Sequence, residues 1–315
     1  LRALRRARRD AHIALVGLAV NRPLVNRFSA YIDELIVFPG YPGLPEQPFD
    51  EAAFTQFRIR TRERSFDLAL QLHGSGPASN GLTIAIGARI NAGFHLPEEP
   101  CPDADTFLPY SDDESEVLRP LRLLSHLGIE ARDAALEFPI EPEDEEEIDE
   151  LLGSSGFGET SFACIHPGAA EPSKRWPAER FALVGRALAR EGLRVAVTGV
   201  DKESRLTSEV GRSIGHAAID LGGRCSLGGL AVLLRRSRLL VCNDTGVSHL
   251  AAAVRVPSVV VASSPNTSRW APLDGRLHHV VAQAGAAPVA AAAVLAEAKR
   301  LFAPLTTART SPAKA

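Results

Sequence analysis

Short apolar runs alternate with stretches of helical periodicity along most of the chain. Apolar runs of about four to eight residues are typical of buried strands, whereas apolar positions spaced three and four apart are typical of helices. Alternation of the two predicts parallel sheets whose strands are joined by crossover helices. In the first half the pattern predicts strands at 13–16, 35–38, 68–72 and 90–94, helices at 2–8, 51–62 and 114–127, and a loop at 95–113.

The second half shows the same alternation more regularly. Its apolar runs are followed by helical segments of ordinary length, which is typical of one doubly wound β/α domain. The pattern predicts strands at 162–166, 194–198, 217–220, 239–243 and 258–262, and helices at 178–191, 202–214, 227–236, 247–254 and 289–302.

Chain length and the position of an acidic run indicate how the chain is divided into domains. A chain of 315 residues exceeds what one hydrophobic core usually supports, so we expect two Rossmann-like domains. The acidic run at 141–147 suits the first turn of a helix, because carboxylates stabilise the positive end of a helix dipole. The predicted organisation is an N-terminal domain at 1–140, an acidic linker and helix at 141–160, a C-terminal domain at 161–302 and a disordered tail at 303–315.

Charge and cysteine content narrow the function classes. The net charge of −3 gives no whole-protein attraction to nucleic acid. No apolar run approaches the roughly 20 residues that span a bilayer. The four cysteines are scattered, with no CxxC pair, so neither a disulfide framework nor a metal site is expected. These features predict a cytoplasmic protein.

A polar, glycine-containing segment follows the strand predicted at 162–166. Doubly wound sheets bind ligands beyond the carboxyl ends of their strands, which is where this segment lies. The turn at Gly168 would let backbone N–H groups approach an anion, and Ser173, Lys174 and Arg175 follow it, with two positive charges for phosphates. An ordinary strand–helix loop with surface cations explains the segment equally well.

The next strand is also followed by candidate ligand-binding residues. Thr198 and Gly199 come directly after it, and Glu203 lies near the start of the following helix. An acidic residue in this position of a nucleotide-binding fold can accept hydrogen bonds from ribose hydroxyls. A glutamate in the first turn of a helix is also common for its interaction with the dipole alone.

The densest polar cluster follows the strand predicted at 239–243. Asp244, Thr245 and Gly246 open a helix, and His249 lies one turn further on. The first N–H groups of a helix have no partner within it, so they can bind a diphosphate where a glycine lets the ligand come close. A capped core helix with a buried histidine is the alternative, but so many polar groups at one strand end favour a binding site.

Together these motifs resemble glycosyltransferase family 9, the ADP-heptose:lipopolysaccharide heptosyltransferase-like family. The resemblance rests on segments 166–169, 173–177, 198–199 and 243–250, and it extends over nearly the whole chain. It implies a GT-B fold, in which two Rossmann-like domains face each other. It also implies inverting, metal-independent transfer of a sugar, often heptose from ADP-heptose, to a lipopolysaccharide core, with no cofactor.

The resemblance implies roles for individual residues. Lys174 would stabilise the leaving diphosphate and is the expected catalytic residue. Glu203 would contact the ribose, and Leu227 would lie near the base. The substrate-binding residues that the resemblance implies are Gly168, Ser173, Lys174, Thr198, Gly199, Glu203, Leu227, Asp244, Thr245, Gly246, His249 and, on the acceptor side, His73.

The first half resembles the acceptor-binding part of the family less closely. Residues 66–76 are similar to its strand and loop facing the acceptor, although a plain turn explains His73 equally well. The implied partners are a nucleotide-sugar donor and a lipid-linked glycan. The arginine-rich segment 1–9 is either a contact with anionic lipid at the inner membrane or a solvated helix.

The sequence departs from the family at its start. Family members begin with a strand and a Gly-Asp loop whose Asp is the expected general base, whereas this sequence begins at the following helix. We therefore expect an N-terminal domain that lacks its first strand. Either the sequence is a shortened glycosyltransferase, as its missing methionine suggests, or it is a non-catalytic nucleotide-sugar-binding protein. A sugar-nucleotide epimerase is a third hypothesis, and the sequence leaves the donor, the acceptor and the oligomeric state open.

Overall fold

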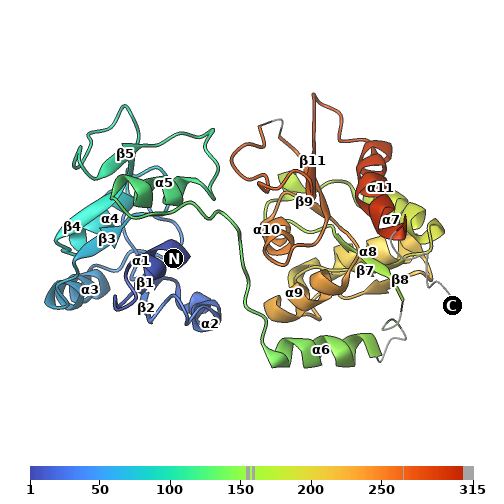
Figure 1. The fold of residues 1–315 in the computed structure, drawn as a ribbon, viewed down its shortest axis with the longest axis horizontal. Helices are drawn as coiled ribbons and strands as arrows, with labels where there is room; N and C mark the ends of the chain where they lie inside the picture. The colour runs from blue at the N-terminus through green and yellow to red at the C-terminus, as the bar shows by residue number, and fades with distance from the viewer. Residues whose placement is uncertain (154–156, 158–159, 265, 308–315) are drawn as a thin grey trace, which may run out of the picture. The chain divides into compact units, whose positions relative to one another are not determined.

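The computed structural model describes residues 1–153, 157, 160–264 and 266–307. The chain divides into two compact units, Leu1–Ala134 and Ala135–Ala315, which are called the first and the second unit below (Figure 1). All pairings between the strands are parallel. The predicted α/β class with parallel sheets is therefore confirmed. No helix in the described part of the chain is both long and apolar enough to cross a membrane.

The first unit contains two small sheets, one of β1 and β2 and one of β3, β4 and β5. Each has its own apolar cluster, one around Val25 and Leu35 and the other around Phe94 and Leu123. The elements are α1 (Arg2–Ala7), β1 (Ala14–Gly17), the 3₁₀ turn η1 (Ala19–Asn21), α2 (Arg22–Arg27), β2 (Glu34–Val37), α3 (Glu51–Glu63), β3 (Leu68–Leu70), α4 (Ser79–Ala85), β4 (Ile90–His95), β5 (Phe107–Pro109) and α5 (Arg119–His126).

The first unit differs from the sequence-based expectations in several places. The helix predicted at 114–127 is shorter, since α5 begins at Arg119 and ends at His126. The loop predicted at 95–113 contains β5, a three-residue edge strand that ends at a proline, which is the kind of strand where proline is tolerated. The short helices α2 and α4 were not predicted. The strand predicted at 68–72 ends at Leu70. The backbone N–H of Gln71 still donates to Ala92 of β4, and its buried side chain bonds to the carbonyl oxygens of His73 and Gly74 in the following loop.

The second unit is built on one six-stranded sheet with the order β11-β10-β9-β6-β7-β8. The first strand of the unit, β6, lies inside the sheet between β7 and β9. The elements are α6 (Pro142–Gly153), β6 (Phe162–His166), η2 (Pro172–Lys174), α7 (Ala178–Arg190), β7 (Arg194–Val197), η3 (Asp201–Glu203), α8 (Ser204–Ile214), β8 (Ala218–Asp220), α9 (Leu227–Arg236), β9 (Leu240–Asn243), α10 (Gly246–Ala253), β10 (Ser258–Ala262), β11 (His278–Ala282) and α11 (Ala291–Thr307).

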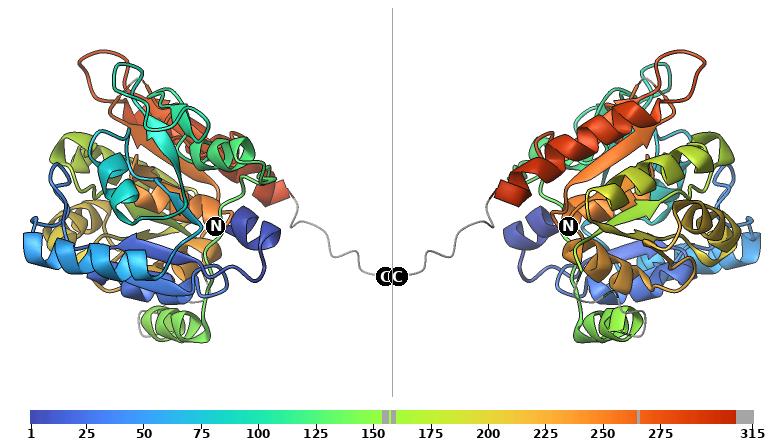
Figure 2. Two further views of the ribbon diagram at one scale, coloured as in Figure 1. Left: turned by 90° about the vertical axis from the view of Figure 1, so that its left-hand side faces the viewer. Right: turned by 90° about the vertical axis from the view of Figure 1, so that its right-hand side faces the viewer.

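Helices cover both faces of this sheet. Ala163 and Ile165 of β6 pack in a cluster with α7, α8 and α11, whereas Phe162 and Cys164 pack in a second cluster with α6, α9 and α10. Figure 2 shows α11, in red, alongside α7. Because both faces are buried, the central strands are continuous apolar runs, and this is why they were predicted from the sequence.

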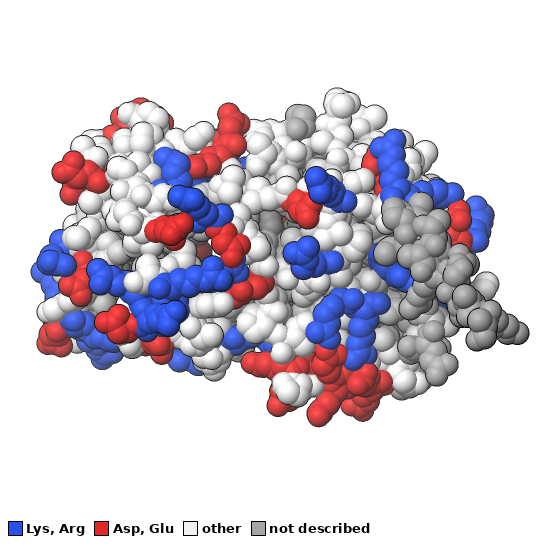
Figure 3. All heavy atoms as spheres, viewed as in Figure 1, with Lys and Arg blue, Asp and Glu red and all other residues white. Residues whose placement is uncertain are grey.

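The acidic segment predicted as a linker and helix forms α6 and packs on α9. Arg235 and Arg236 of α9 form ion pairs with Glu145, and Arg236 also pairs with Asp149. Figure 3 shows acidic side chains gathered at the bottom of the view, where α6 lies in Figure 1, directly below a group of basic side chains. Residues 154–156 and 158–159 of the predicted linker lie outside the described residues.

The C-terminal helix corrects one boundary. It was expected to end at 302, before a tail at 303–315, but α11 continues to Thr307. The remaining residues of the predicted tail, 308–315, lie outside the described part of the chain. Strand β11 was not predicted, because its two histidines, His278 and His279, interrupt the apolar pattern.

Candidate functional site at the carboxyl edge of the second sheet

The carboxyl ends of β6, β7, β9 and β10 lie along one edge of the second unit's sheet, because its strands are parallel. Ligands of doubly wound folds bind in this position. The predicted segments that begin at Gly168, Thr198 and Asp244 all lie in the loops at this edge. The sheet order therefore brings together segments that are far apart in the sequence.

The loop after β6 is packed tightly on the segment after β7. The Nδ1 atom of His166 lies 3.0 Å from Oγ1 of Thr198. A Cβ atom added to Gly168 would lie 2.2 Å from Oε2 of Glu203, so only glycine leaves room for this carboxylate. Glu203 accepts a hydrogen bond from the Val200 N–H at 3.0 Å, and its side chain is 4% exposed. Three predicted site residues, Gly168, Thr198 and Glu203, therefore belong to one packed cluster.

Arg175, which was expected to add positive charge for phosphate, makes its contacts within this cluster instead. Its Nε and Nη2 atoms donate to the carbonyl oxygen of Ala169 at 3.0 and 2.8 Å. Its Nη2 atom also lies 3.8 Å from Oε1 of Glu203. Burial lowers the pKa of His166, and the negative charge of Glu203 opposes this effect. The guanidinium of Arg175 thus offsets the buried carboxylate and orders the loop.

Lys174 is the more accessible cation of the same loop. It lies in η2, its side chain is 42% exposed, and its Nζ atom is 3.1 Å from Oε1 of Glu171. An exposed ion pair of this kind contributes little, so Glu171 is a weak competitor for an anionic ligand. Ser173, next to it, is exposed. The structure thus leaves Lys174 able to bind an anion.

The N-terminus of α10 is open. Its N-cap, Thr245, makes no side-chain capping hydrogen bond, and a Cβ atom on Gly246 would meet no atom within 4 Å. Among the described residues, no acceptor meets the backbone N–H of Gly246 or of Val247. Unpaired N–H groups at the positive end of a helix dipole form an anion-binding site.

The neighbouring helix α9 shows the opposite arrangement. The side chain of Ser226 accepts a hydrogen bond from the Gly229 N–H at 2.9 Å. Glu147 of α6 in turn accepts from the N–H of Ser226 at 2.7 Å. The positive end of α9 is therefore already occupied by a carboxylate and a cap, whereas that of α10 is left for a ligand.

His249 lies one turn into α10. Burial lowers its pKa, and the nearby carboxylate of Asp244 opposes this effect. Its ring packs edge-on against Trp270, with 6.2 Å between the ring centroids. A histidine with a lowered pKa is neutral at pH 7 while no ligand is bound, and its ring can donate a hydrogen bond to a ligand.

Asn243, at the end of β9, connects the two halves of the site. It is fully buried and hydrogen-bonds to Pro167, Gly168 and Trp176. Sequence reasoning assigned it no role. An amide at the end of an apolar strand was the only signal, since its partners lie 67–76 residues earlier in the chain.

Leu227 and His73 are the remaining predicted site residues. Leu227, the first residue of α9, is 52% exposed. The loop before it contacts Gly199, another predicted site residue, because the Gly223 N–H donates to the Gly199 carbonyl oxygen at 2.8 Å. His73 belongs to the first unit. Its side chain is 64% exposed and its Nε2 atom lies 3.0 Å from Oε1 of Glu46.

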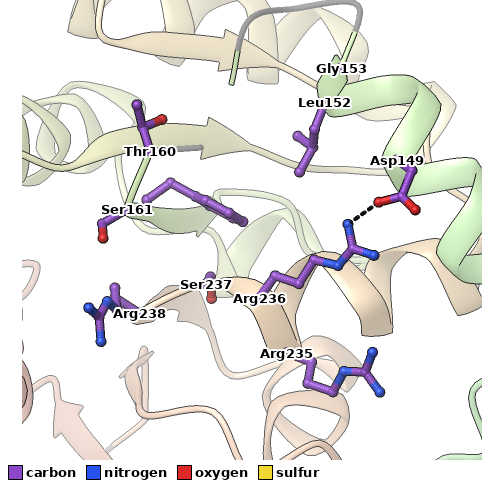
Figure 4. Close-up of a pocket in the computed structure, with 10 residues that line it drawn as sticks. Asp149, Leu152, Gly153, Thr160, Ser161, Arg235, Arg236, Ser237 and Arg238 are labelled. Carbon is purple, nitrogen blue, oxygen red and sulfur yellow. Dashed lines mark hydrogen bonds and ion pairs between the residues drawn. The ribbon is translucent and has the colours of Figure 1, made fainter. Parts of the chain in front are cut away.

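A cavity of about 560 Å³ lies at the other end of the sheet, near the amino ends of β6 and β9 (Figure 4). Arg235, Arg236 and Arg238 line it, and Arg236 is paired with Asp149 at 2.6 Å. None of the predicted site residues lines this cavity. It is therefore separate from the carboxyl-edge site.

The sequence matches a known family over most of its length. Residues 55–297 match the model of glycosyltransferase family 9 (heptosyltransferase). The chain belongs to this family. Lipooligosaccharide heptosyltransferase 2 of Haemophilus influenzae is 28% identical over 121 residues, which cover 37% of this chain and 35% of that protein. The family resemblance of the motifs is thus confirmed, although the match spans only about a third of this curated relative.

Solved structures of family members have the same fold. The family 9 glycosyltransferase of Veillonella parvula DSM 2008 superposes with a TM-score of 0.78 at 22% identity, covering 96% of this chain and 91% of that one. Escherichia coli ADP-heptose lipopolysaccharide heptosyltransferase II gives a TM-score of 0.72 at 21% identity, with coverages of 97% and 93%. At these identities the likeness shows the fold alone, and it agrees with the predicted fold class.

Proposed function

We propose that this member of glycosyltransferase family 9 transfers a heptosyl group from ADP-heptose to a lipopolysaccharide-core-like glycan, with inversion at the anomeric carbon. The donor is the one named for the similar Escherichia coli enzyme, and the acceptor class is the one named for the Haemophilus relative. Transfer breaks the bond between the anomeric carbon and the diphosphate and forms a bond from that carbon to an acceptor hydroxyl oxygen, whose proton passes to a general base or to water. The chemical requirement is therefore stabilisation of a leaving nucleoside diphosphate.

The open N-terminus of α10 is the observation that carries this proposal. Its free N–H groups at Gly246 and Val247 would bind the diphosphate, and Lys174 would add a positive charge to the leaving group. His249 would donate a further hydrogen bond to the diphosphate or to the donor sugar. These groups supply the electrophilic assistance that a divalent cation gives in other transferases, so we propose metal-independent transfer.

The nucleoside would lie along the loops after β7 and β8. We propose that Glu203 contacts the ribose, that Thr198 and Gly199 line the same side, and that the exposed Leu227 packs against the base. Gly168, Ser173, Asp244 and Thr245 would line the phosphates. On the acceptor side we propose His73, since its imidazole is largely exposed.

The acceptor class suggests where the protein acts. A lipid-linked glycan lies at a membrane surface, so we propose a cytoplasmic enzyme that reaches the inner membrane peripherally. The arginines of α1 and its flank would provide the contact with anionic headgroups, since Arg6, Arg8 and Arg9 are exposed.

Calorimetric titration with ADP, UDP and GDP tests the nucleotide site. We expect ADP to bind, and Lys174→Ala to weaken it about tenfold or more, since a charge-assisted contact with phosphate is lost. Lys299→Ala is the matched control, because Lys299 also forms an exposed ion pair, with Glu191 at 2.6 Å. A protein that binds none of the three nucleotides, or a Lys174→Ala variant with wild-type affinity, contradicts the proposal.

Turnover of ADP-heptose tests the reaction itself. A transferase releases ADP only when the glycan acceptor is present, whereas an epimerase converts the donor without any acceptor. A non-catalytic binding protein would bind ADP and leave the donor intact. Only acceptor-dependent release of ADP, with the heptose recovered on the acceptor, agrees with the proposed function.

A further inference from the structure

We propose that Asn243 is a positioning residue for the diphosphate site. Its side-chain amide fixes the position of the loop between β6 and α7, which carries Lys174, relative to the open N-terminus of α10. This inference rests on the proposed function and extends it to a residue that would not itself touch the substrate. It follows from the hydrogen bonds of one buried side chain, which join two segments that are separated by about 70 residues.

Both the nitrogen and the oxygen of the Asn243 amide form hydrogen bonds. Its Nδ2 atom donates to the carbonyl oxygens of Pro167 at 2.8 Å and Gly168 at 3.1 Å, and its Oδ1 atom accepts from the Trp176 N–H at 2.9 Å. The residue is 0% exposed. Only a primary amide offers two donors and an acceptor in one short side chain. The site therefore requires asparagine for its hydrogen bonds and not for its volume.

The two ends of this bridge are the two halves of the proposed anion site. Trp176 follows Lys174 by two residues, and Pro167 and Gly168 are the first residues of the loop that leads to it. On the other side, Asn243 precedes Gly246 by three residues and is bonded through β9 to the sheet. The side chain of Asn243 thus adds a direct link between the loop that carries Lys174 and the segment that leads into α10.

The rest of β9 shows that this amide is exceptional. Leu240, Val241 and Cys242 are apolar and fully buried, and the strand lies inside the sheet between β6 and β10. An apolar residue at 243 would continue the strand but leave two carbonyl groups and one N–H buried without partners. Such groups are costly, and the simplest relief is movement of the loop. Loop movement would displace Lys174.

The variant Asn243→Asp tests this directly. It keeps the acceptor for the Trp176 N–H but replaces the donor by an oxygen that faces two carbonyl oxygens. We expect ADP affinity at about pH 8 to fall about tenfold or more, and AMP affinity to fall much less, because the β-phosphate depends most on the register of the two segments. The quantity to compare is the gain in affinity from AMP to ADP, measured by calorimetry well below each melting temperature.

A pH series adds a readout that general loosening of the fold would not produce. Burial and the two carbonyl groups raise the pKa of the introduced carboxyl, so lowering the pH protonates it and restores one donor. We therefore expect the ADP affinity of Asn243→Asp to approach that of the wild type as the pH falls from about 8 to about 6. Asn243→Ser, which retains a hydroxyl donor, should lie between the two at about pH 8.

Gln71→Glu is the matched control in the first unit. Gln71 is also a buried amide that follows a strand. It bonds to His73 and Gly74 of the loop after β3, to Ser79 of α4 and to the Phe94 N–H. The same amide-to-carboxylate change there should lower the melting temperature and leave the AMP-to-ADP gain at its wild-type value.

The outcomes separate this inference from the proposed function. If Asn243→Asp lowers the melting temperature but retains the wild-type AMP-to-ADP gain, Asn243 is a structural residue only and the inference is wrong. If Asn243→Asp does not fold, the same comparison with Asn243→Ser decides. If the wild type binds no ADP, or Lys174→Ala binds it normally, the proposed function itself fails.

Discussion

The carboxylate of Glu203 occupies the space in which a side chain at Gly168 would lie. A Cβ atom at Gly168 would stand 2.2 Å from Oε2 of Glu203, well inside van der Waals contact. The backbone of Gly168 is not in the left-handed region, so its conformation alone would allow any residue. Glycine is required here because a buried carboxylate and the loop after β6 pack against each other.

Gly168→Ala should therefore destabilise the protein by about 1–3 kcal/mol through overpacking. Chemical denaturation measures the loss, and the double variant Gly168→Ala/Glu203→Ala should recover part of it because the clash is removed. Gly275→Ala, where a Cβ atom meets nothing within 4 Å, is the control and should be close to neutral. Strictly additive effects of Gly168→Ala and Glu203→Ala would show that the two residues do not interact.

The cap of α9 gives a second prediction. Glu147 accepts hydrogen bonds from the N–H of Ser226 at 2.7 Å and from its Oγ at 2.5 Å. Glu147→Ala should lower the free energy of unfolding by about 1–2 kcal/mol, since the helix loses its capping carboxylate. Glu146→Ala, the exposed neighbour on α6, should change it far less. Equal denaturation midpoints for the two variants would argue against the cap.

An ion-pair cluster in the first unit predicts a pH dependence. Hydrogen bonds from Arg64 and His12 lower the pKa of Glu34 from 4.5 to about 2. A folded-state pKa below the unfolded value stabilises the fold above pH 4.5, and this contribution is lost as the pH falls toward about 2.

Glu34→Gln should consequently cost stability at neutral pH and progressively less at acid pH. The cost should stay below about 1 kcal/mol, because the pair is partly exposed and screened by solvent. Urea unfolding of wild type and variant at about pH 6, 4 and 3 measures the difference. A difference that does not change with pH would contradict the assignment.

His249 predicts coupling between ADP binding and protonation. Burial lowers the pKa of the free imidazole, so it is neutral at pH 7, and a bound diphosphate would favour its charged form. ADP should therefore bind with proton uptake at about pH 6.5, and more tightly as the pH falls. Calorimetry in two buffers of different ionisation enthalpy measures the protons taken up.

The histidine variants make that measurement specific. His249→Gln should remove the uptake that remains after the protonation of ADP itself is subtracted. His216→Gln is the control, because His216 is exposed and lies two residues beyond the C-terminal end of α8. Identical proton uptake by wild type and His249→Gln would place the diphosphate away from α10.

The central strands of the second unit could be predicted from the sequence because burial on both faces makes each a continuous apolar run. Strands β6 and β10 match their predicted bounds, 162–166 and 258–262. Strands β5 and β11 lie at sheet edges and were not predicted, because neither forms a continuous apolar run: β5 ends at a proline and β11 begins with two histidines.

The site was predictable as separate segments and not as an arrangement. Gly168, Lys174 and Gly246 each carry a local signal, namely a glycine turn, a cation or a helix start. The packing of Glu203 under Gly168 and the bridge made by Asn243 carry none, because both depend on segments that the sheet brings together.

A crystal structure of the protein with ADP tests the central claim most directly. We predict that the β-phosphate lies against the backbone N–H groups of Gly246 and Val247, with the ammonium group of Lys174 within hydrogen-bond distance. Density for ADP in the arginine-lined cavity at the opposite end of the sheet, or a β-phosphate that contacts neither α10 nor Lys174, would contradict the account.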